Sequence, residues 1–336
     1  MNRREFLIKM IAGAASVPFL SCDTIQNKRE SKTCVLNGCE DIAKLNNEII
    51  GGSFDGKIIT ETGKVVANTA SIPVAQNVPK EIAQNPDEAH RILEITVTPD
   101  SQKIYAIAPH KGIIEIEKNE TNLILDLNDF PNFKFLNNLV LSPEGNILFT
   151  NSSQIWRRPS YLEILEDCDN SGGVFCFNLK NKKIQEISGG KGLYFPNGIA
   201  MNNQNDILVA EGHRGCIWKI KQNNLNCREI FTRLDFYVDN LQMQKINDAE
   251  TLIAAGFAPT HPIEKITRYS RGDFFKYFLR EFSFNCVAPF IRGEPKSSVI
   301  LIDPVSGKIQ KIHKTDWPKV SSALIENKKL ILGTLK

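Results

Sequence analysis

The stretch NNLVLSPEGNILF, residues 137–149, holds the pattern that decides the fold. Two polar residues, Asn137 and Asn138, precede a short apolar run, a turn from Ser142 to Asn146 follows, and a second apolar run ends at Phe149. Short apolar runs on either side of a turn that contains Pro, Gly and Asn are typical of two antiparallel strands. The stretch therefore predicts a two-strand unit that begins with polar side chains.

The same kind of unit recurs along the chain. A polar or acidic residue stands before a strand-like apolar run at five further points, which are Glu40-Asp41, His90, Asn197, Asp239-Asn240 and Ser321-Ser322. Units of a few strands that repeat at about 40–50 residues are the signature of a β-propeller. The sequence therefore predicts an all-β fold, a six-bladed β-propeller over residues 34–336, with no composition shift that would mark a second domain.

The polar residues of the repeat have a common place in such a fold. Equivalent positions of the blades lie on one ring around the central channel, so the pattern gathers Glu40, His90, Asn137, Asn197, Asp239 and Asn240 at one end. Most of them are oxygen donors, and carboxylates with amide carbonyls suit Ca²⁺, whereas Zn²⁺ prefers His and Cys. The alternative is that each residue only caps a turn. Their shared phase in the repeat favours a calcium site.

The N-terminus is typical of a bacterial export signal. Arg3-Arg4-Glu5-Phe6-Leu7-Ile8-Lys9 has the twin-arginine pattern, and the apolar stretch that follows is too short to span a bilayer. Phe19-Leu20-Ser21-Cys22 resembles a lipobox, although cleavage by ordinary signal peptidase is an alternative. We therefore expect a signal peptide over residues 1–22, a polar tether over 23–33, and a protein exported to the periplasm or anchored to the membrane through lipidated Cys22.

Composition limits the partners. The formal net charge is +3, and no basic block or aromatic-interleaved Lys/Arg run is present, which argues against a nucleic-acid partner. We expect a monomer that binds a small molecule. An exported chain may oxidise its cysteines, and Cys216 and Cys227 flank a predicted hairpin, so a disulfide between them is plausible.

Two segments at the end of the repeat series carry further expectations. Within residues 265–290 the aromatic residues recur at spacings of three and four, which predicts a short helical insertion between blades five and six. It can be a lid, a membrane contact or a helix packed as plain structure. The chain ends too early for a complete last blade, so we expect residues 33–36 to supply the missing strand.

Several stretches resemble a known superfamily. GLYFPNGIA (192–200), followed by ILVAEG (207–212) and IWKI (217–220), is similar to strictosidine synthase-like proteins. LDFYVDNL (234–241) and GCEDI (38–42) look more like the paraoxonase/arylesterase branch, and gluconolactonases belong to the same wider group. The resemblance covers roughly residues 34–336.

The resemblance implies a six-bladed propeller with calcium in its channel. The calcium ligands of paraoxonase-like enzymes match Glu40, Asn137, Asn197, Asp239 and Asn240. A second, structural calcium would involve Asp41 and Asn138, but Asn138 departs from the acidic residue of the family. The histidine pair of those enzymes falls on His90 and His110.

The function expected from these residues is hydrolysis of lactones or aryl esters. Bound calcium would polarise the carbonyl, and His90 would activate water as general base. No Gly-x-Ser-x-Gly motif supports a serine hydrolase. A non-catalytic propeller that acts as a binding platform at the cell envelope is the alternative. Pictet–Spengler condensation, as in strictosidine synthase itself, needs a catalytic Glu that the sequence does not place.

Overall fold

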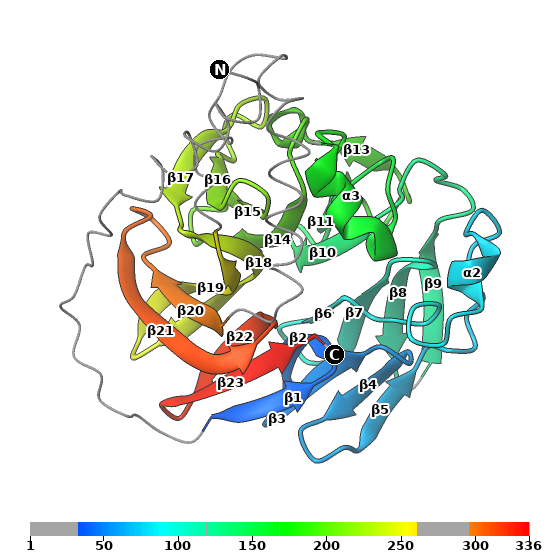
Figure 1. The fold of residues 1–336 in the computed structure, drawn as a ribbon, viewed down its shortest axis with the longest axis horizontal. Coiled ribbons are helices and arrows are strands. Elements are labelled where there is room, and N and C mark those ends of the chain that lie inside the picture. Colours follow the sequence, from blue (N-terminus) through cyan, green and yellow to red (C-terminus); the bar gives the residue numbers. More distant parts are fainter. Residues whose placement is uncertain (1–32, 119, 168, 261–295, 336) are drawn as a thin grey trace, which may run out of the picture. The chain divides into compact units, whose positions relative to one another are not determined.

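The computed structural model describes residues 33–118, 120–167, 169–260 and 296–335, which form six β-sheets around a channel (Figure 1). The first three sheets have four strands each, in chain order. They contain β2 (Cys39–Leu45), β3 (Glu48–Ser53), β4 (Lys57–Thr60) and β5 (Val65–Asn68); β6 (Glu94–Val97), β7 (Lys103–Ala108), β8 (Gly112–Glu117) and β9 (Glu120–Asp126); and β10 (Leu136–Leu141), β11 (Ile147–Asn151), β12 (Gly173–Phe177) and β13 (Ile184–Glu186).

The last three sheets continue the same arrangement. They contain β14 (Pro196–Met201), β15 (Ile207–Glu211), β16 (Cys216–Ile220) and β17 (Glu229–Arg233); β18 (Phe236–Ile246), β19 (Ala249–Pro259), β20 (Lys296–Ile302) and β21 (Ile309–Pro318); and β22 (Val320–Glu326), β23 (Lys329–Thr334) and β1 (Cys34–Asn37). The first strands β2, β6, β10, β14, β18 and β22 contact one another in sequence and line the channel. The predicted six-bladed β-propeller is therefore confirmed.

The chain closes the propeller by pairing its two ends. β1 pairs with β23, with Cys34 opposite Ile331 and Asn37 opposite Thr334, which confirms the strand predicted at residues 33–36. The pairing is parallel, because β1 must end where β2 begins and β23 ends at the same side of the sheets. Gly38, with φ +80°, makes the sharp turn between β1 and β2.

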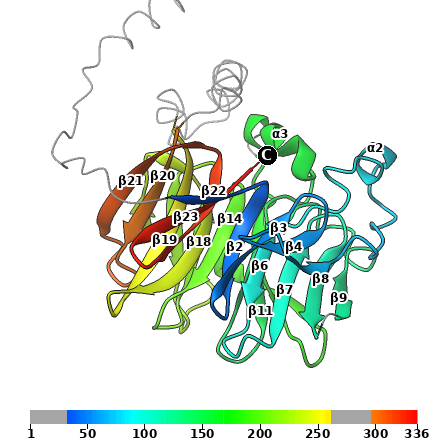
Figure 2. The same ribbon diagram turned by 90° about the horizontal axis from the view of Figure 1, so that it is seen from below.

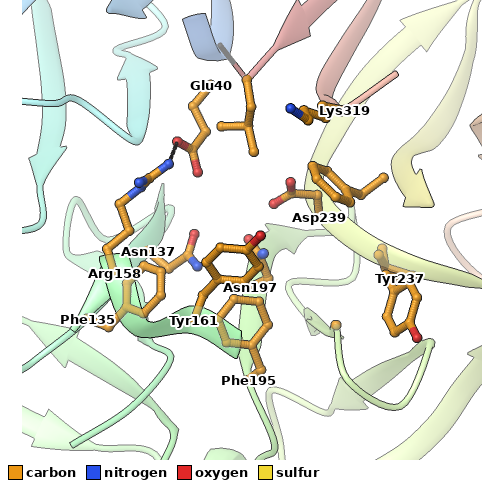
Figure 3. A pocket seen from close by; sticks show the side chains of 14 residues that line it. Glu40, Phe135, Asn137, Arg158, Tyr161, Phe195, Asn197, Tyr237, Asp239 and Lys319 are labelled. Atoms are coloured by element: carbon orange, nitrogen blue, oxygen red, sulfur yellow. Dashed lines mark hydrogen bonds and ion pairs between the residues drawn. The ribbon is translucent and has the colours of Figure 1, made fainter. Parts of the chain in front are cut away.

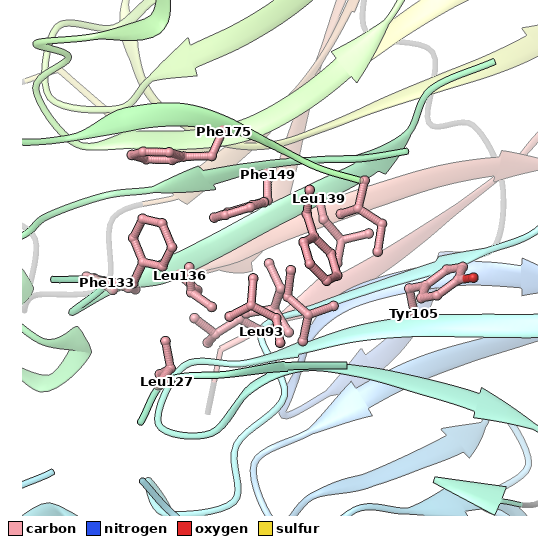
Figure 4. Close-up of a cluster of buried hydrophobic side chains, with 14 of the residues drawn as sticks. Leu93, Tyr105, Leu127, Phe133, Leu136, Leu139, Phe149 and Phe175 are labelled. Atoms are coloured by element: carbon pink, nitrogen blue, oxygen red, sulfur yellow. The ribbon is translucent and has the colours of Figure 1, made fainter. Parts of the chain in front are cut away.

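Six separate hydrophobic clusters hold neighbouring blades together, one at each interface between blades. The largest joins the second and third blades, where Leu93 and Tyr105 face Leu139 and Phe149 (Figure 4). Phe133 packs edge-on against Phe149, with ring centroids 5.4 Å apart. Burial of apolar area at about 25 cal/mol per Å² drives this packing and leaves the channel itself to polar residues.

Five of the six innermost strands, all except β6, share an irregularity at their channel end. The pairing register shifts by a β-bulge at Glu40-Asp41 in β2, Asn137-Asn138 in β10, Asn197-Gly198 in β14, Asp239-Asn240 in β18 and Ser321 in β22. A bulge breaks the alternation of faces, so that two successive residues can both turn towards the channel. The polar pairs of the sequence repeat therefore lie at the bulges.

The helices lie outside the regular sheets. The short helices are α2 (Lys80–Ala83), η1 (Arg158–Ser160), α3 (Tyr161–Glu166) and η2 (Ser188–Gly190). η1 and α3 interrupt the third sheet between β11 and β12, and α2 and α3 lie on the same side of the sheets (Figure 2). None of the described helices is long and apolar enough to cross a membrane.

Some predictions concern segments that the structure does not describe. The signal peptide, most of the tether and the predicted helix at residues 265–290 lie outside the described residues. The strands on either side of that predicted insertion, β19 and β20, are neighbours in the fifth sheet.

The expected disulfide is wrong: Cys216 and Cys227 are both free thiols, the first buried and the second exposed. In the ladder Cys216 lies opposite Arg233, whereas Cys227 belongs to the loop before β17, so the two residues do not face each other.

Candidate functional site

A pocket of about 290 Å³ opens at the bulged end of the channel (Figure 3). It is lined by Glu40, Phe135, Asn137, Arg158, Tyr161, Phe195, Asn197, Gly212, Tyr237, Val238, Asp239, Phe257, Lys319 and Leu335. The aromatic side chains form walls from several blades and from α3, while the polar ones gather at the bottom. Such a pocket can bind the apolar part of a small molecule and present polar groups to its other end.

Four of the predicted residues meet at the bottom of the pocket: Glu40, Asn137, Asn197 and Asp239. We call this set the pocket floor. Each comes from the bulge of a different innermost strand, and Figure 3 shows the four side chains directed into the same cavity. Gly198 lets two of these strands approach closely, because a Cβ there would lie 2.4 Å from the backbone nitrogen of Leu241.

Hydrogen bonds orient the two floor amides. The Nδ2 of Asn137 donates to Ser152 Oγ at 2.9 Å, which turns its Oδ1 away from Ser152. The amide of Asn197 is hydrogen-bonded to the carboxylate of Asp239. The remaining Oδ1 of Asn197 is buried and has no hydrogen-bond partner in the protein. A buried acceptor without a partner is costly, so this oxygen indicates a missing ligand or solvent molecule.

The two floor carboxylates differ in their surroundings. Burial, and next the negative charge of Glu40, raise the pKa of Asp239 well above its usual value. Glu40 faces two cations instead, since its Oε2 lies 3.4 Å from Arg158 Nη2 and 3.7 Å from Arg91 Nη1. Glu40 is therefore paired with two cations, whereas burial disfavours the charged form of Asp239.

Arg158 and Arg91 bridge Glu40 to a second carboxylate, Glu88. Arg158 Nη1 donates to Glu88 Oε1 at 2.5 Å, and Arg91 Nε lies 3.6 Å from the same oxygen. His110 Nε2 lies 3.7 Å from Glu88 Oε2 on the other side. We call Glu40, Glu88, Arg91 and Arg158 the charge cluster. None of the four side chains is more than 15% exposed, so their charges are weakly screened.

A second polar layer lies one residue further along the innermost strands. This deep layer consists of Asp41, Glu94, Asn138 and Asn240, all buried. Asn138 Nδ2 donates to Glu94 and, at 3.1 Å, to Asn240 Oδ1. Asn240 Nδ2 in turn donates to Asp41 Oδ1 at 3.3 Å. The layer is thus one connected network.

The oxygens of the deep layer are already used. Asn138 Oδ1 accepts from the Ile199 amide at 3.0 Å, and Asp41 Oδ2 accepts from the Ile95 amide at 3.3 Å. Burial, and next the charge of Asp41, raise the pKa of Glu94 well above its usual value, while burial raises the pKa of Asp41. A second, structural calcium at Asp41 and Asn138 would have to share or displace these hydrogen bonds, so it stays a prediction of the resemblance.

The predicted catalytic histidines lie outside the pocket lining. His90 stands in the loop before β6; burial, and next the charge of Lys111, lower its pKa. His110 is fully buried and approaches the pocket only through Glu88 and Arg158. Arg91, directly after His90, makes the contact with Glu40 instead. The histidine roles remain predictions.

Sequence reasoning missed four residues of the site and its surroundings. Glu94 is the first residue of β6 and takes the channel position that the repeat had assigned to His90. Glu88, Arg91 and Arg158 come from loops, where the repeat carries no signal. Only the buried pairing of Arg158 with two carboxylates reveals them, and that pairing exists only in the folded chain.

The donors of the pocket floor are of the chemical type that Ca²⁺ takes. It offers two carboxylates, the open Oδ1 of Asn197 and the amide of Asn137, which are hard oxygen donors. No group of three or more His, Cys, Asp or Glu side chains arranged to hold a metal is found among the described residues, which leaves a site that depends on amide oxygens. Asn240, the remaining predicted ligand, and Asp41 belong to the deep layer rather than to the pocket lining.

Comparisons with known proteins give a family match and several relatives. Residues 137–220, which include Asn137 and Asn197, match the strictosidine synthase family. The adipocyte plasma membrane-associated protein of Rattus norvegicus is 24% identical over 304 residues, 85% of this chain and 77% of that protein. Protein STRICTOSIDINE SYNTHASE-LIKE 3 of Arabidopsis thaliana is 26% identical over 148 residues, 43% of this chain and 36% of that protein.

A solved structure shares the fold. A gluconolactonase from Xanthomonas campestris superposes with a TM-score of 0.52 at 12% identity, over 85% of this chain and 79% of that one. That similarity, at 12% identity, shows a shared fold. Together the comparisons confirm the resemblance stated from the sequence: the chain fits the superfamily of six-bladed propellers that contains strictosidine synthase-like, paraoxonase/arylesterase and gluconolactonase proteins.

Proposed function

We propose that the chain is an exported, calcium-dependent hydrolase of lactones or aryl esters, with its active site in the pocket. The observation that carries the proposal is the buried, unpartnered Oδ1 of Asn197 beside Asp239 and Glu40, beneath apolar walls. The floor is polar and lies under a cavity with apolar walls, which suits an apolar substrate. Bound calcium would supply a Lewis acid for the substrate carbonyl.

The residues of the chain have separate tasks in this proposal. Glu40, Asn137, Asn197 and Asp239 would hold the cation, with Asn240 supporting the floor from the deep layer. The walls formed by Phe135, Tyr161, Phe195, Tyr237 and Phe257 bind the apolar part of the substrate and exclude bulk water. Exclusion of water strengthens every charge interaction at the floor.

Hydrolysis also needs a group that moves a proton. Water adds across the acyl C–O bond, so one proton leaves the attacking water and one reaches the departing oxygen. Asp239 lines the pocket, and one of its carboxylate oxygens can take that proton while the other faces the cation. His90 and His110, the bases expected from the sequence, do not line the pocket, which favours a floor carboxylate in this role.

The test is a panel of lactones and aryl esters, assayed with calcium and with a chelator. We expect hydrolysis of at least one class of substrate, lost on chelation and lost in Asp239→Asn. Glu250→Gln removes an exposed carboxylate at the start of β19, outside the pocket lining, and is the matched control, expected to keep full activity. Absence of turnover across the whole panel, with calcium still bound, would favour the binding platform.

The proposal includes export and attachment, as expected from residues 1–22. Cell fractionation and labelling with a fatty-acid analogue should find the mature chain at the cell envelope, lipidated in the native protein and not in Cys22→Ser. Labelling that persists in Cys22→Ser, or a cytoplasmic protein that retains residues 1–22, would contradict it.

A further inference from the structure

In the charge cluster, the guanidinium of Arg158 lies beside Glu40, a carboxylate that the proposed function assigns to the metal. Arg158 Nη2 lies 3.4 Å from Glu40 Oε2, and Figure 3 shows this pair at the edge of the pocket. A guanidinium and a calcium ion offer the same carboxylate a positive charge, so they compete for Glu40. The fold keeps Arg158 beside the pocket. Arg158 is the first residue of η1, and Tyr161, which follows η1, lines the same pocket.

Arg158 has a second carboxylate available to it. Its Nη1 donates to Glu88 Oε1 at 2.5 Å, which is shorter than its contact with Glu40. Glu88 is itself held in place, since its backbone amide donates to Asn85 O at 3.0 Å and its other carboxylate oxygen faces His110. Arg158 can therefore release Glu40 and still keep a buried partner, which avoids the large cost of an unpaired buried charge.

We infer that Arg158 is a competing counter-ion of the metal site, which pairs with Glu40 in the absence of calcium and remains on Glu88 when calcium takes Glu40. The inference rests on the proposed function for its choice of metal. It makes Glu88, which does not line the pocket, a positioning residue that controls calcium affinity through Arg158. Arg91 has the same two partners at longer distances, 3.7 Å to Glu40 and 3.6 Å to Glu88, and contributes less.

Substitutions at Arg158 and at Glu88 should change the calcium affinity in opposite directions. Arg158→Gln removes the competitor, so calcium should bind about tenfold more tightly. Glu88→Gln removes the alternative partner and leaves Arg158 to Glu40 alone, so calcium should bind about tenfold more weakly. A merely structural role of either residue would lower calcium affinity in both variants or change neither.

The experiment is calorimetric titration of the full mature chain with CaCl₂. Surface changes of the same charge, Lys245→Gln and Glu250→Gln, are the controls and should titrate like the wild type. In the double variant Arg158→Gln/Glu88→Gln the effect of Glu88 should largely vanish, leaving an affinity within about threefold of Arg158→Gln, because coupled residues are not additive.

The variant Arg158→Lys provides a second test of the competition if the Glu88→Gln protein does not fold. A lysine is a point charge that cannot bridge two carboxylates as a guanidinium does, so it should stay with Glu88 and also tighten calcium binding. Unchanged or weakened binding in Arg158→Gln and Arg158→Lys, with calcium bound by the wild type, overturns the inference and leaves the proposed function standing. If neither wild type nor Arg158→Gln binds calcium, the proposed function and this inference both fail.

Discussion

The pocket floor and the deep layer are built from neighbouring residues of the same strands and yet differ in chemistry. Glu40, Asn137 and Asp239 belong to the floor, while the residues directly after them, Asp41, Asn138 and Asn240, belong to the deep layer. The floor keeps an unpartnered oxygen at Asn197, whereas the oxygens of Asn138 and Asn240 accept protein hydrogen bonds. Residue type suggests a metal in both layers, but between these two layers only the floor has a buried oxygen without a hydrogen-bond partner.

The difference follows from what each layer faces. The floor opens to a cavity, so its polar groups need a ligand, an ion or solvent. The deep layer is closed by side chains from four innermost strands, which satisfy one another without help. Fully satisfied buried networks give rigidity. We therefore regard the deep layer as the support of the floor and expect one calcium per chain, at the floor.

The largest expected effect tests the floor. Asp239→Asn keeps the shape of the side chain but removes a charged ligand and the proposed proton carrier, so turnover should fall by about 10³-fold or more. The calcium-dependent rise in melting temperature should disappear at the same time, since a metal that binds only the folded chain stabilises it by mass action. A wild type that melts at the same temperature with calcium and with chelator would show that the floor is not a metal site.

The next effect tests the deep layer. Asn138→Leu removes one hydrogen-bond partner each from Glu94, Asn240 and the Ile199 amide, all in a buried place. The free energy of unfolding should fall by about 3 kcal/mol, measured by urea titration. In the control Asn223→Leu, at an exposed turn, the free energy of unfolding should fall by less than about 0.5 kcal/mol. Metal analysis of the wild type should find one calcium ion per chain. Two calcium ions per chain would contradict the proposed difference between the floor and the deep layer.

The pH dependence tests the proton in the deep layer. Because the folded state raises the pKa of Glu94, it holds a proton that the unfolded chain loses above about pH 4. This stabilisation is present below the unfolded pKa and is lost as the pH rises through the folded pKa. In calcium-free buffer the wild type should therefore lose stability as the pH rises above the unfolded pKa of the carboxyl group.

The variant Glu94→Gln isolates the contribution of the Glu94 proton to the pH dependence of stability, because glutamine resembles the protonated acid and does not titrate. Urea unfolding should show a flatter pH profile than the wild type, and at pH 8 the variant should be more stable by about 1 kcal/mol or more. Glu250→Gln, on the surface, should keep the wild-type profile. Parallel profiles for wild type and Glu94→Gln would place the titrating group elsewhere.

The smallest expected effect concerns His90. This side chain is outside the pocket lining, so His90→Gln should change kcat/KM by less than about tenfold and leave calcium binding unaltered. A loss of about 10²–10⁴ would instead restore His90 as the general base expected from the sequence. The measurement is steady-state kinetics on whichever lactone or ester the panel identifies.

The sequence repeat predicted more of the floor than of its surroundings. Glu40, Asn137, Asn197 and Asp239 share a phase in the repeat, and that phase survives in the fold because each lies at the bulge of an innermost strand. The second blade has no such bulge, since β6 pairs regularly with β7 from Glu94 onwards. That is why the prediction chose His90, four residues before the strand, and missed Glu94.

The sequence by itself determined the six-bladed propeller, its closure by the N-terminal strand and four residues of the pocket floor. These features follow from the period of apolar runs and turns, which is a local property of the chain. The N-terminal segment before residue 33 adds an expectation about export that remains to be tested.

Only the tertiary structure decided which oxygens are open and which cations stand beside them. Asn138 and Asn197 are the same residue type in successive repeats, but one amide oxygen accepts a backbone hydrogen bond and the other has no partner. Arg158 reaches Glu40 across 118 residues of chain, from a loop that follows no repeat. Hydrogen-bond satisfaction and charge pairing depend on distances between blades, and those distances exist only once the blades have packed against one another.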